Sequence, residues 1–533
     1  MEQVANAEMS NLGNNRPREG GPSHPPGTVE LLTTAHNARG DGEVILIPTP
    51  SDDPNDPLIW SMWRKVVNYG LLTAMTTAVF TALSTQTVFW AQMLQDMDVT
   101  YQDLANALAV QLAGLAVGCI VIIPFTKKYG RRLTYIISTG IVAAASWWSA
   151  YMRTALELYL TNILLGIEGA TNEAAVQMSI HDMFFIHQRG TANGIYFAAV
   201  MAGSFLTPMA AGAQAVSSGW RASYVTLGAA MKALTFLFAM GFEETKFVPV
   251  ISGRSAGPPS GLELGPKDDV ASESARPAGD AARVPFPRYL RLQLLTTTDE
   301  SLWKTFYYPM YSWWFPHVIF TSLQLASGIC WLLVLASIIS IVFSAPPYNF
   351  DVAAVGYMFA GPCVGTVFGS LYGGYFVDRA VVWLARRNGG LFEPEMRLYP
   401  LPLPSFVMTA GLIIFGVTAD RGLHWIFPSI GGALFAFGFG AISDISSTLV
   451  LDAYPNLVAH TFVVITFIRN AVSIAGAFFI TPGLNSMGVS NMFIMAGCVS
   501  LLVNSLALPL AIWGKRARTA VAPRYHRLSQ ETS

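Results

Sequence analysis

The residues Glu243-Glu244-Thr245-Lys246 open the longest polar stretch of the chain, which continues through sequence rich in Gly, Ser, Pro and Asp to about Pro309. Almost everything on either side of this stretch is apolar, in blocks of about 20 residues. Six such blocks precede the stretch and six follow it. A polar spacer between two sets of six apolar blocks predicts a membrane protein built from two helical bundles.

The composition supports a membrane location and disfavours several functional classes. Hydrophobic residues make up 52% of the 533 residues and charged residues only 12%, about half the share that is usual in soluble proteins. A net charge of −1 gives no reason to expect a nucleic acid partner. The four cysteines lie inside apolar blocks and the eight histidines lack metal-ligand spacing, so neither a disulfide framework nor a metal site is expected. No nucleotide-binding or catalytic motif occurs, so we expect no cofactor and no enzymatic activity.

The apolar blocks predict twelve membrane-spanning helices, because a hydrocarbon core about 30 Å thick requires about 20 helical residues per crossing. These spans are expected at 66–89, 104–125, 133–151, 159–180, 192–214, 223–242, 317–343, 357–377, 403–418, 425–447, 458–480 and 492–513. The N-terminal bundle then covers 66–242 and the C-terminal bundle 317–513. Outside them we expect a disordered N-terminal tail over 1–65, a central loop over 243–316 and a C-terminal tail over 514–533.

The distribution of Lys and Arg predicts the orientation of the chain. Positive charges concentrate in the loops after spans 2, 4 and 8, in the central loop and in the C-terminal tail. The alternate loops carry only Arg153, Arg221 and Arg421. This bias places both termini and the central loop in the cytosol.

Two loops at corresponding places in the two halves carry related motifs. The first reads Thr126-Lys127-Lys128-Tyr129-Gly130-Arg131-Arg132, and the second begins at Gly369 and ends Gly373-Gly374-Tyr375-Phe376-Val377-Asp378-Arg379. Together they resemble the paired cytosolic loop signature of the major facilitator superfamily, a glycine-led run into Asp-Arg-x-Gly-Arg-Arg. The second copy lacks the trailing Gly-Arg-Arg, and Lys127 occupies the usual aspartate position in the first. The resemblance implies a gating role for these charged residues, whereas plain positive-inside charge is the alternative for a single loop.

Further stretches narrow the resemblance. Asp182, followed six residues later by Arg189-Gly190, resembles a cytosolic gate signature found across this superfamily. The run Gly194, Gly203, Thr207-Pro208 and Ala211-Gly212 resembles the antiporter motif of drug:proton exporters, with Thr207 and Ala211 in place of glycines. A generic small-residue helix interface is the alternative reading of that run. The stretches Asp53–Ser61 and Gly389–Leu398 resemble parts of fungal twelve-span drug:proton antiporter-like proteins.

Polar and ionisable side chains inside the predicted spans are candidates for transport chemistry, because charged groups there cost free energy. In span 4, Glu168, Asn172 and Glu173 lie near mid-depth. Burial favours the protonated form of a carboxylate, so we expect Glu168 or Glu173 to carry a proton. Glu173 is favoured because it shares a helical stripe with Asn162 and two glycines; a structural hydrogen bond between helices is the alternative. Further proton or substrate candidates are Asp444, Arg469 and Asn470.

The resemblance implies an all-α major facilitator fold with two six-helix bundles and alternating access between them. The expected function is proton-coupled efflux of a small amphipathic organic compound, such as a drug or a fungal secondary metabolite, across the plasma membrane. The expected partners are that small-molecule substrate, protons and the lipid bilayer, with the protein acting as a monomer. An importer of a small nutrient on the same scaffold is the alternative, and a non-transporting membrane sensor is a more distant one.

Overall fold

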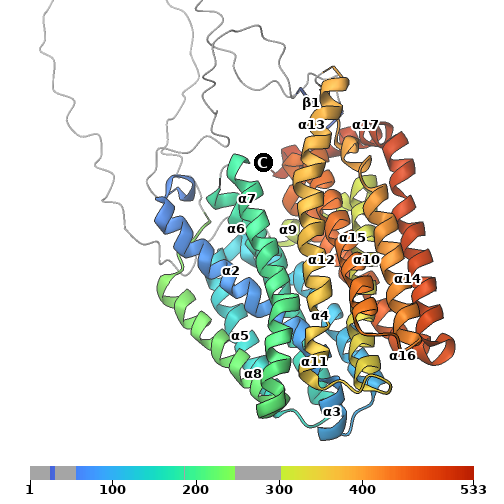
Figure 1. Cartoon of the computed structure of the whole chain (residues 1–533). Coiled ribbons are helices and arrows are strands. Elements are labelled where there is room, and N and C mark those ends of the chain that lie inside the picture. The colour runs from blue at the N-terminus through green and yellow to red at the C-terminus, as the bar shows by residue number, and fades with distance from the viewer. Residues whose placement is uncertain (1–24, 31–55, 185, 247–301, 390, 533) are drawn as a thin grey trace, which may run out of the picture.

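A computed structural model describes residues 25–30, 56–184, 186–246, 302–389 and 391–532. Within these ranges the chain is helical, apart from one antiparallel pair of two-residue strands, β1 (Val29–Glu30) and β2 (Leu391–Phe392) (Figure 1). The predicted all-α class is confirmed.

The first half begins with a short 3-10 helix, η1 (Pro57–Ile59). Its remaining elements are α2 (Met62–Ser84), η2 (Thr85–Phe89), α3 (Trp90–Asp96), α4 (Tyr101–Tyr129), α5 (Arg131–Tyr151), α6 (Ala155–Met183), α7 (Ile186–Met201), the π-helical turn η3 (Ala202–Leu206) and α8 (Thr207–Gly241). Thr100 and Thr154 start α4 and α6 with capping boxes. Gly130, at φ 102°, forms the turn between α4 and α5.

The second half begins with the short helix α9 (Leu302–Tyr311). It continues with η4 (Ser312–Trp314), α10 (Pro316–Ser344), α11 (Val352–Tyr357), α12 (Ala360–Leu371), η5 (Tyr372–Phe376), α13 (Val377–Arg387), η6 (Pro394–Leu398), α14 (Pro402–Asp420), α15 (Ile426–Ala453), η7 (Pro455–Leu457), α16 (Val458–Ser505) and α17 (Ala507–Thr532). The turn η5 is π-helical, as is η3 in the first half.

Eight helical stretches among the described residues are long and apolar enough to cross a bilayer. Helices α5 and α6 lie outside this set, because Ser, Thr and Trp lower the hydropathy of α5 and the polar residues of its interior lower that of α6. Helices α8 and α16 are kinked at Gly219 (φ 75°) and Gly488 (φ 71°), which are the positions of the expected loops after spans 5 and 11. Helical residues therefore cover all twelve expected spans, while twelve crossings remain a prediction.

Three expected polar segments contain regular structure. Residues 25–30 and 56–65 of the expected disordered tail include β1, η1 and the start of α2. The expected central loop contains α9, and the expected C-terminal tail is mostly α17. These segments pack against the bundles, which composition does not reveal: β1 pairs with β2, α9 contacts α4 and α16, and α17 contacts α10 and η6. The rest of the central loop and of the N-terminal tail lies outside the described residues.

The helices run between two ends of the molecule. Figure 1 places β1, α13 and α17 at one end, which we call the tail face, and α3 and α11 at the opposite end, the far face. At the far face the two halves meet where α8 packs against α11. A Cβ atom on Gly212 of α8 would lie only 2.8 Å from the carbonyl oxygen of Val352, so glycine is required for this close approach.

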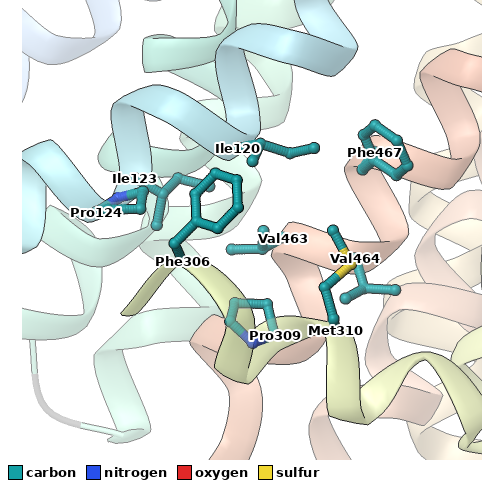
Figure 2. Close-up of a pocket in the computed structure, with 9 residues that line it drawn as sticks. All are labelled: Ile120, Ile123, Pro124, Phe306, Pro309, Met310, Val463, Val464 and Phe467. Carbon is teal, nitrogen blue, oxygen red and sulfur yellow. The ribbon is translucent and has the colours of Figure 1, made fainter. Parts of the chain in front are cut away.

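A second contact between the halves joins α4 to α16. Helix α9 covers this seam: Figure 2 shows Phe306, Pro309 and Met310 of α9 facing residues of α4 and α16. The cavity enclosed there is about 10 Å³, about the volume needed for a single water molecule. Helix α9 therefore packs closely along the contact between the halves. The cavity there is too small for a substrate.

Candidate transport site

An ion pair joins the two halves inside the molecule. Glu173 of α6 pairs with Arg469 of α16, and their side chains are 11% and 16% exposed. Asn470 Nδ2 donates to Glu173 Oε2 at 3.3 Å, and Arg469 Nε donates to Asn470 Oδ1 at 3.3 Å. Glu173 lies four residues from residue 169, the midpoint of α6, or about 6 Å along the helix. The structure thus brings together three of the predicted residues, one from the first half and two from the second.

The pair has a clear electrostatic consequence. A buried carboxylate and guanidinium are tolerated because each compensates the charge of the other, and removing one leaves an uncompensated buried charge. Because Glu173 and Arg469 belong to different halves, a relative movement of the halves would separate them. The ion pair therefore depends on the contact between the halves.

Uncharged polar groups are buried in the first half, on α2, α4 and α6. Asn172 is fully buried, and its Oδ1 accepts a hydrogen bond of 2.9 Å from Thr76 Oγ1 of α2. The buried polar atoms without a hydrogen-bond partner among the described residues include Gln111 Nε2 of α4, and Asn162 Oδ1 and Asn172 Nδ2 of α6. Buried polar groups are normally hydrogen-bonded, so these amides are groups that a polar ligand could satisfy. Sequence reasoning singled out Asn172 but missed Thr76 and Gln111.

At the tail face of the first half, the motif between α4 and α5 binds two acids. Arg131 pairs with Asp182 at the end of α6, which joins two of the predicted gating residues. The carboxylate of Glu244 accepts the backbone N–H groups of Arg131 at 3.0 Å and Arg132 at 3.2 Å. A carboxylate at a helix N-terminus is favoured by the helix dipole and satisfies free N–H groups. Glu244 was not among the predicted residues.

The other cations of this motif support the same turn. Lys246 Nζ donates to the backbone carbonyls of Lys127 and Lys128, and Arg132 Nη2 donates to Ala239 O at 2.7 Å. Thus Lys127 and Lys128 contribute carbonyl groups to the turn. The side chain of Arg189, the other half of the predicted gate signature, lies outside the described part of the chain.

The second half carries a related cluster at the tail face. Arg397 Nη1 donates to Asp378 Oδ1 at 2.7 Å, and Arg397 Nε donates to Asp452 Oδ2 at 2.5 Å. Arg379 stacks over the ring of Tyr375, with its Cζ 4.4 Å from the centroid. The predicted gating residue Asp378 therefore shares an arginine with the end of α15. Arg397 was missed as a gating residue, although it lies in the quoted stretch Gly389–Leu398.

The sequence profile described as Major Facilitator Superfamily matches residues 71–477, which is most of the chain. The chain belongs to the major facilitator superfamily. A relative of this transporter from Schizosaccharomyces pombe, named as an uncharacterized MFS-type transporter, is 28% identical over 94% of both chains. Efflux pump bik6 of Gibberella fujikuroi is 24% identical, covering 90% of this chain and 94% of its own.

A solved structure supports the fold. The partially occluded inward open xylose transporter XylE of E. coli superimposes with a TM-score of 0.58 at 13% identity, covering 84% of this chain and 97% of the other. The predicted membership of the superfamily and the likeness to fungal transporters are both confirmed by these matches.

Two acids of this major facilitator stand apart from the central ion pair. The backbone carbonyl of Glu168 accepts from Ser138 of α5 at 3.0 Å, and the Glu168 side chain also lies beside Ser138. Asp444 packs against Gly373 of η5, where a Cβ atom would lie 2.8 Å from that of Asp444, and beside Ser370. Glu168 therefore faces a helix of its own bundle, and Asp444 faces η5 and α12. Of Glu168, Glu173 and Asp444, it is Glu173 that contacts the opposite half in the described part of the chain.

The antiporter-like motif lies at helix crossings. A Cβ atom on Gly203 would lie 2.5 Å from the carbonyl oxygen of Thr77 in α2, which leaves room only for glycine. Thr207 and Thr81 hydroxyls are 2.6 Å apart, and Pro208 and Gly212 lie beside α11 of the other half. Nothing is described of the surroundings of Gly194. The motif thus fits α7, η3 and α8 closely against α2 and against the opposite half.

A hollow of about 520 Å³ lies between α2 and the two legs of α8. Its volume is in the range of small-molecule sites. Its walls combine alanines and leucines with hydroxyl and amide groups, among them Thr77, Thr81, Gln214 and Tyr224. No charged side chain lines it, so it suits a neutral, partly apolar molecule.

Proposed function

We propose that this transporter exports a small amphipathic organic compound in exchange for protons. The observation that carries the proposal is the ion pair between Glu173 of one half and Arg469 of the other. A coupling site for protons must change its protonation state as the protein changes conformation. A buried carboxylate whose cationic partner belongs to the opposite bundle meets that requirement.

The coupling follows from competition for the carboxylate. While the halves are close, Arg469 neutralises Glu173 and no proton is needed. When rocking of the halves moves Arg469 away, Glu173 takes up a proton from the side that is then open. Return of Arg469 stabilises the carboxylate and expels the proton to the other side. Asn470 contacts both groups and guides the arginine back to the same carboxylate.

The proposed substrate class rests on polar and apolar groups of the first half. One polar atom each of Gln111, Asn162 and Asn172 lacks a hydrogen-bond partner among the described residues, and the hollow beside α2 combines apolar walls with hydroxyls. Both favour a compound that has apolar bulk and a few polar groups. The relative bik6, which aligns over 94% of its own length, is named an efflux pump, and this name supports export.

We propose that the tail face lies in the cytosol. We also propose that the protein lies in the plasma membrane. Lys127, Lys128, Arg131 and Arg132 all lie in the turn at this face, as expected for cytosolic loops. The Arg131–Asp182 pair and the Asp378–Arg397–Asp452 cluster then lie at the cytosolic entrance. We propose that they break and reform as this entrance opens and closes.

The direct test is transport by the purified protein in lipid vesicles with a panel of labelled amphipathic compounds. At least one compound should move against its concentration gradient when protons can flow down their own gradient in the opposite direction, and a protonophore should abolish that movement. Movement of a compound together with protons, in the same direction, would instead identify an importer. Transport that ignores the pH gradient would contradict proton coupling.

A further inference from the structure

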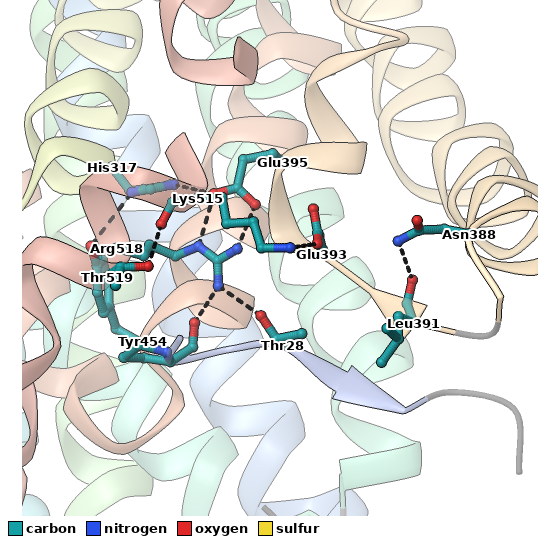
Figure 3. Close-up of polar contacts among 11 residues, drawn as sticks. Thr28, His317, Asn388, Leu391, Glu393, Glu395, Tyr454, Lys515, Arg518 and Thr519 are labelled. Atoms are coloured by element: carbon teal, nitrogen blue, oxygen red, sulfur yellow. Dashed lines mark hydrogen bonds and ion pairs between the residues drawn. The ribbon is translucent and has the colours of Figure 1, made fainter. Parts of the chain in front are cut away.

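The stretch Leu391–Leu398 binds the N-terminal segment of the chain at the tail face. Strand β2 pairs with β1, with Val29 opposite Phe392 and Glu30 opposite Leu391. Figure 3 shows the polar groups beside this pair: Glu393 and Glu395 follow β2, and Lys515 and Arg518 come from α17. The function proposed above uses only Arg397 of this stretch, although the sequence analysis had singled out the whole of it.

Arg518 holds the segment from the side of α17. Its guanidinium is fully buried, and Nε and Nη2 donate to the two carboxylate oxygens of Glu395 at 2.8 and 2.7 Å. Its remaining nitrogen, Nη1, donates to the carbonyl oxygen of Pro26 and to Thr28 Oγ1 at 3.2 Å. A buried guanidinium must have its donors satisfied. The N-terminal segment supplies the acceptors that Glu395 alone does not provide.

Gly27 brings the segment against the end of α15. It has φ 81°, a conformation that favours glycine, and a Cβ atom there would lie 2.4 Å from the carbonyl oxygen of Asp452. Asp452 is also the residue whose carboxylate binds Arg397. The N-terminal segment therefore contacts the backbone of Asp452, a member of the Asp378–Arg397–Asp452 cluster.

We infer that the tail face of the C-terminal bundle is a docking site for a Pro-Pro-Gly-Thr turn that leads into a short strand, filled by the chain's own residues 25–30, and that the docked segment clamps the end of α15. The site recognises the peptide through backbone pairing with β2 and hydrogen bonds from Arg518. It also requires a residue without a side chain at the position of Gly27. A two-residue strand pair with a few further contacts is weak by itself. Covalent attachment gives the segment a millimolar effective concentration, so the dock is filled yet can be opened by a competing peptide or by modification of the segment.

The test uses the full chain in detergent and a fluorescent peptide with the sequence of residues 22–33. Gly27→Val in the protein should undock the segment, because valine clashes with Asp452 and disfavours a positive φ. The peptide should then bind the Gly27→Val protein at least tenfold more tightly than the unaltered protein, whose dock is filled. A peptide that carries the same valine should not bind. Equal binding to both proteins, or binding to neither, would overturn the docking site.

The clamp is tested by hydrogen–deuterium exchange of residues 394–398 and 450–454. Undocking by Gly27→Val should speed exchange there about tenfold, equivalent to ~1.4 kcal/mol, and added peptide should reverse the change. A second variant, Thr28→Val, removes one acceptor of Arg518 and should give a smaller change in the same direction. As an independent check, a Val29→Cys, Phe392→Cys pair should form a disulfide that Gly27→Val prevents. Unchanged exchange in both variants would show that the segment does not clamp α15, whatever the outcome of the transport experiments.

Discussion

Glu244 is expected to be among the most important single side chains for the stability of the N-terminal bundle. Its carboxylate is completely buried and accepts backbone N–H groups from Arg131, Arg132 and Lys246, at distances between 2.9 and 3.2 Å. Replacement by alanine removes the acceptor for all three donors. It also leaves two of them unsatisfied at the buried start of α5.

The size of the loss follows from these contacts. A hydrogen bond to a charged group contributes about 1.5–3 kcal/mol. Because the three bonds share one carboxylate, their contributions do not add fully, and we expect Glu244→Ala to lower the free energy of unfolding by about 3–5 kcal/mol. For a chain of this size that corresponds to a fall in melting temperature of roughly 3–5 °C. The melting temperature of Glu244→Gln should fall less, because its amide oxygen still accepts hydrogen bonds from the backbone.

Melting of the purified protein, followed by tryptophan fluorescence in detergent, measures this change. Glu157→Ala is the matched control: Glu157 accepts the N–H groups of Arg153 at 2.7 Å and Thr154 at 3.2 Å, at the start of α6. Because Glu157 lies at the surface, water replaces it and its loss should matter less. If Glu244→Ala lowers the melting temperature no more than Glu157→Ala does, the reasoning is refuted.

Three other predictions follow from the fold and the gates. Gly203→Val should prevent stable expression, because a Cβ atom at Gly203 would lie 2.5 Å from a carbonyl oxygen of α2; Gly140→Ala, whose Cβ atom would have its nearest neighbour at 3.8 Å, should express normally in the same gel-filtration assay. Arg131→Ala and Asp378→Ala should each slow transport while equilibrium binding of the substrate changes little; an equal loss of binding would indicate misfolding or a direct contact. A protease site inserted at Gly279 should be cut only in permeabilised cells, and cutting from outside would reverse the proposed orientation.

The sequence predicts the fold well because the bilayer imposes a strong pattern of long apolar helices. The Glu173–Arg469 contact was harder to predict. Each residue is visible as an ionisable group inside a span, but they are almost 300 positions apart, and their pairing depends on how the two bundles pack. Composition alone could not reveal that Arg131, next to Gly130, pairs with Asp182 at the end of α6.

Residues in polar stretches were the most difficult to interpret. Glu244 and Arg518 lie in segments whose composition indicates solvent exposure, yet both are completely buried. In each case the charge is stabilised by groups that become neighbours only in the folded chain: the start of α5 for Glu244, and Glu395 with the N-terminal segment for Arg518. The quoted stretch Gly389–Leu398 did signal the second site, although only as a resemblance.

The central claim is that Glu173 carries the coupled proton, and Glu173→Gln in lipid vesicles tests it most directly. The variant should bind substrate and exchange it for labelled substrate, because exchange requires no net proton movement, but it should lose transport driven by a pH gradient. Glu168→Gln, which alters the acid one and a half turns away that faces α5, is the control and should retain pH-driven transport. If Glu173→Gln keeps full pH-driven transport, the claim is contradicted.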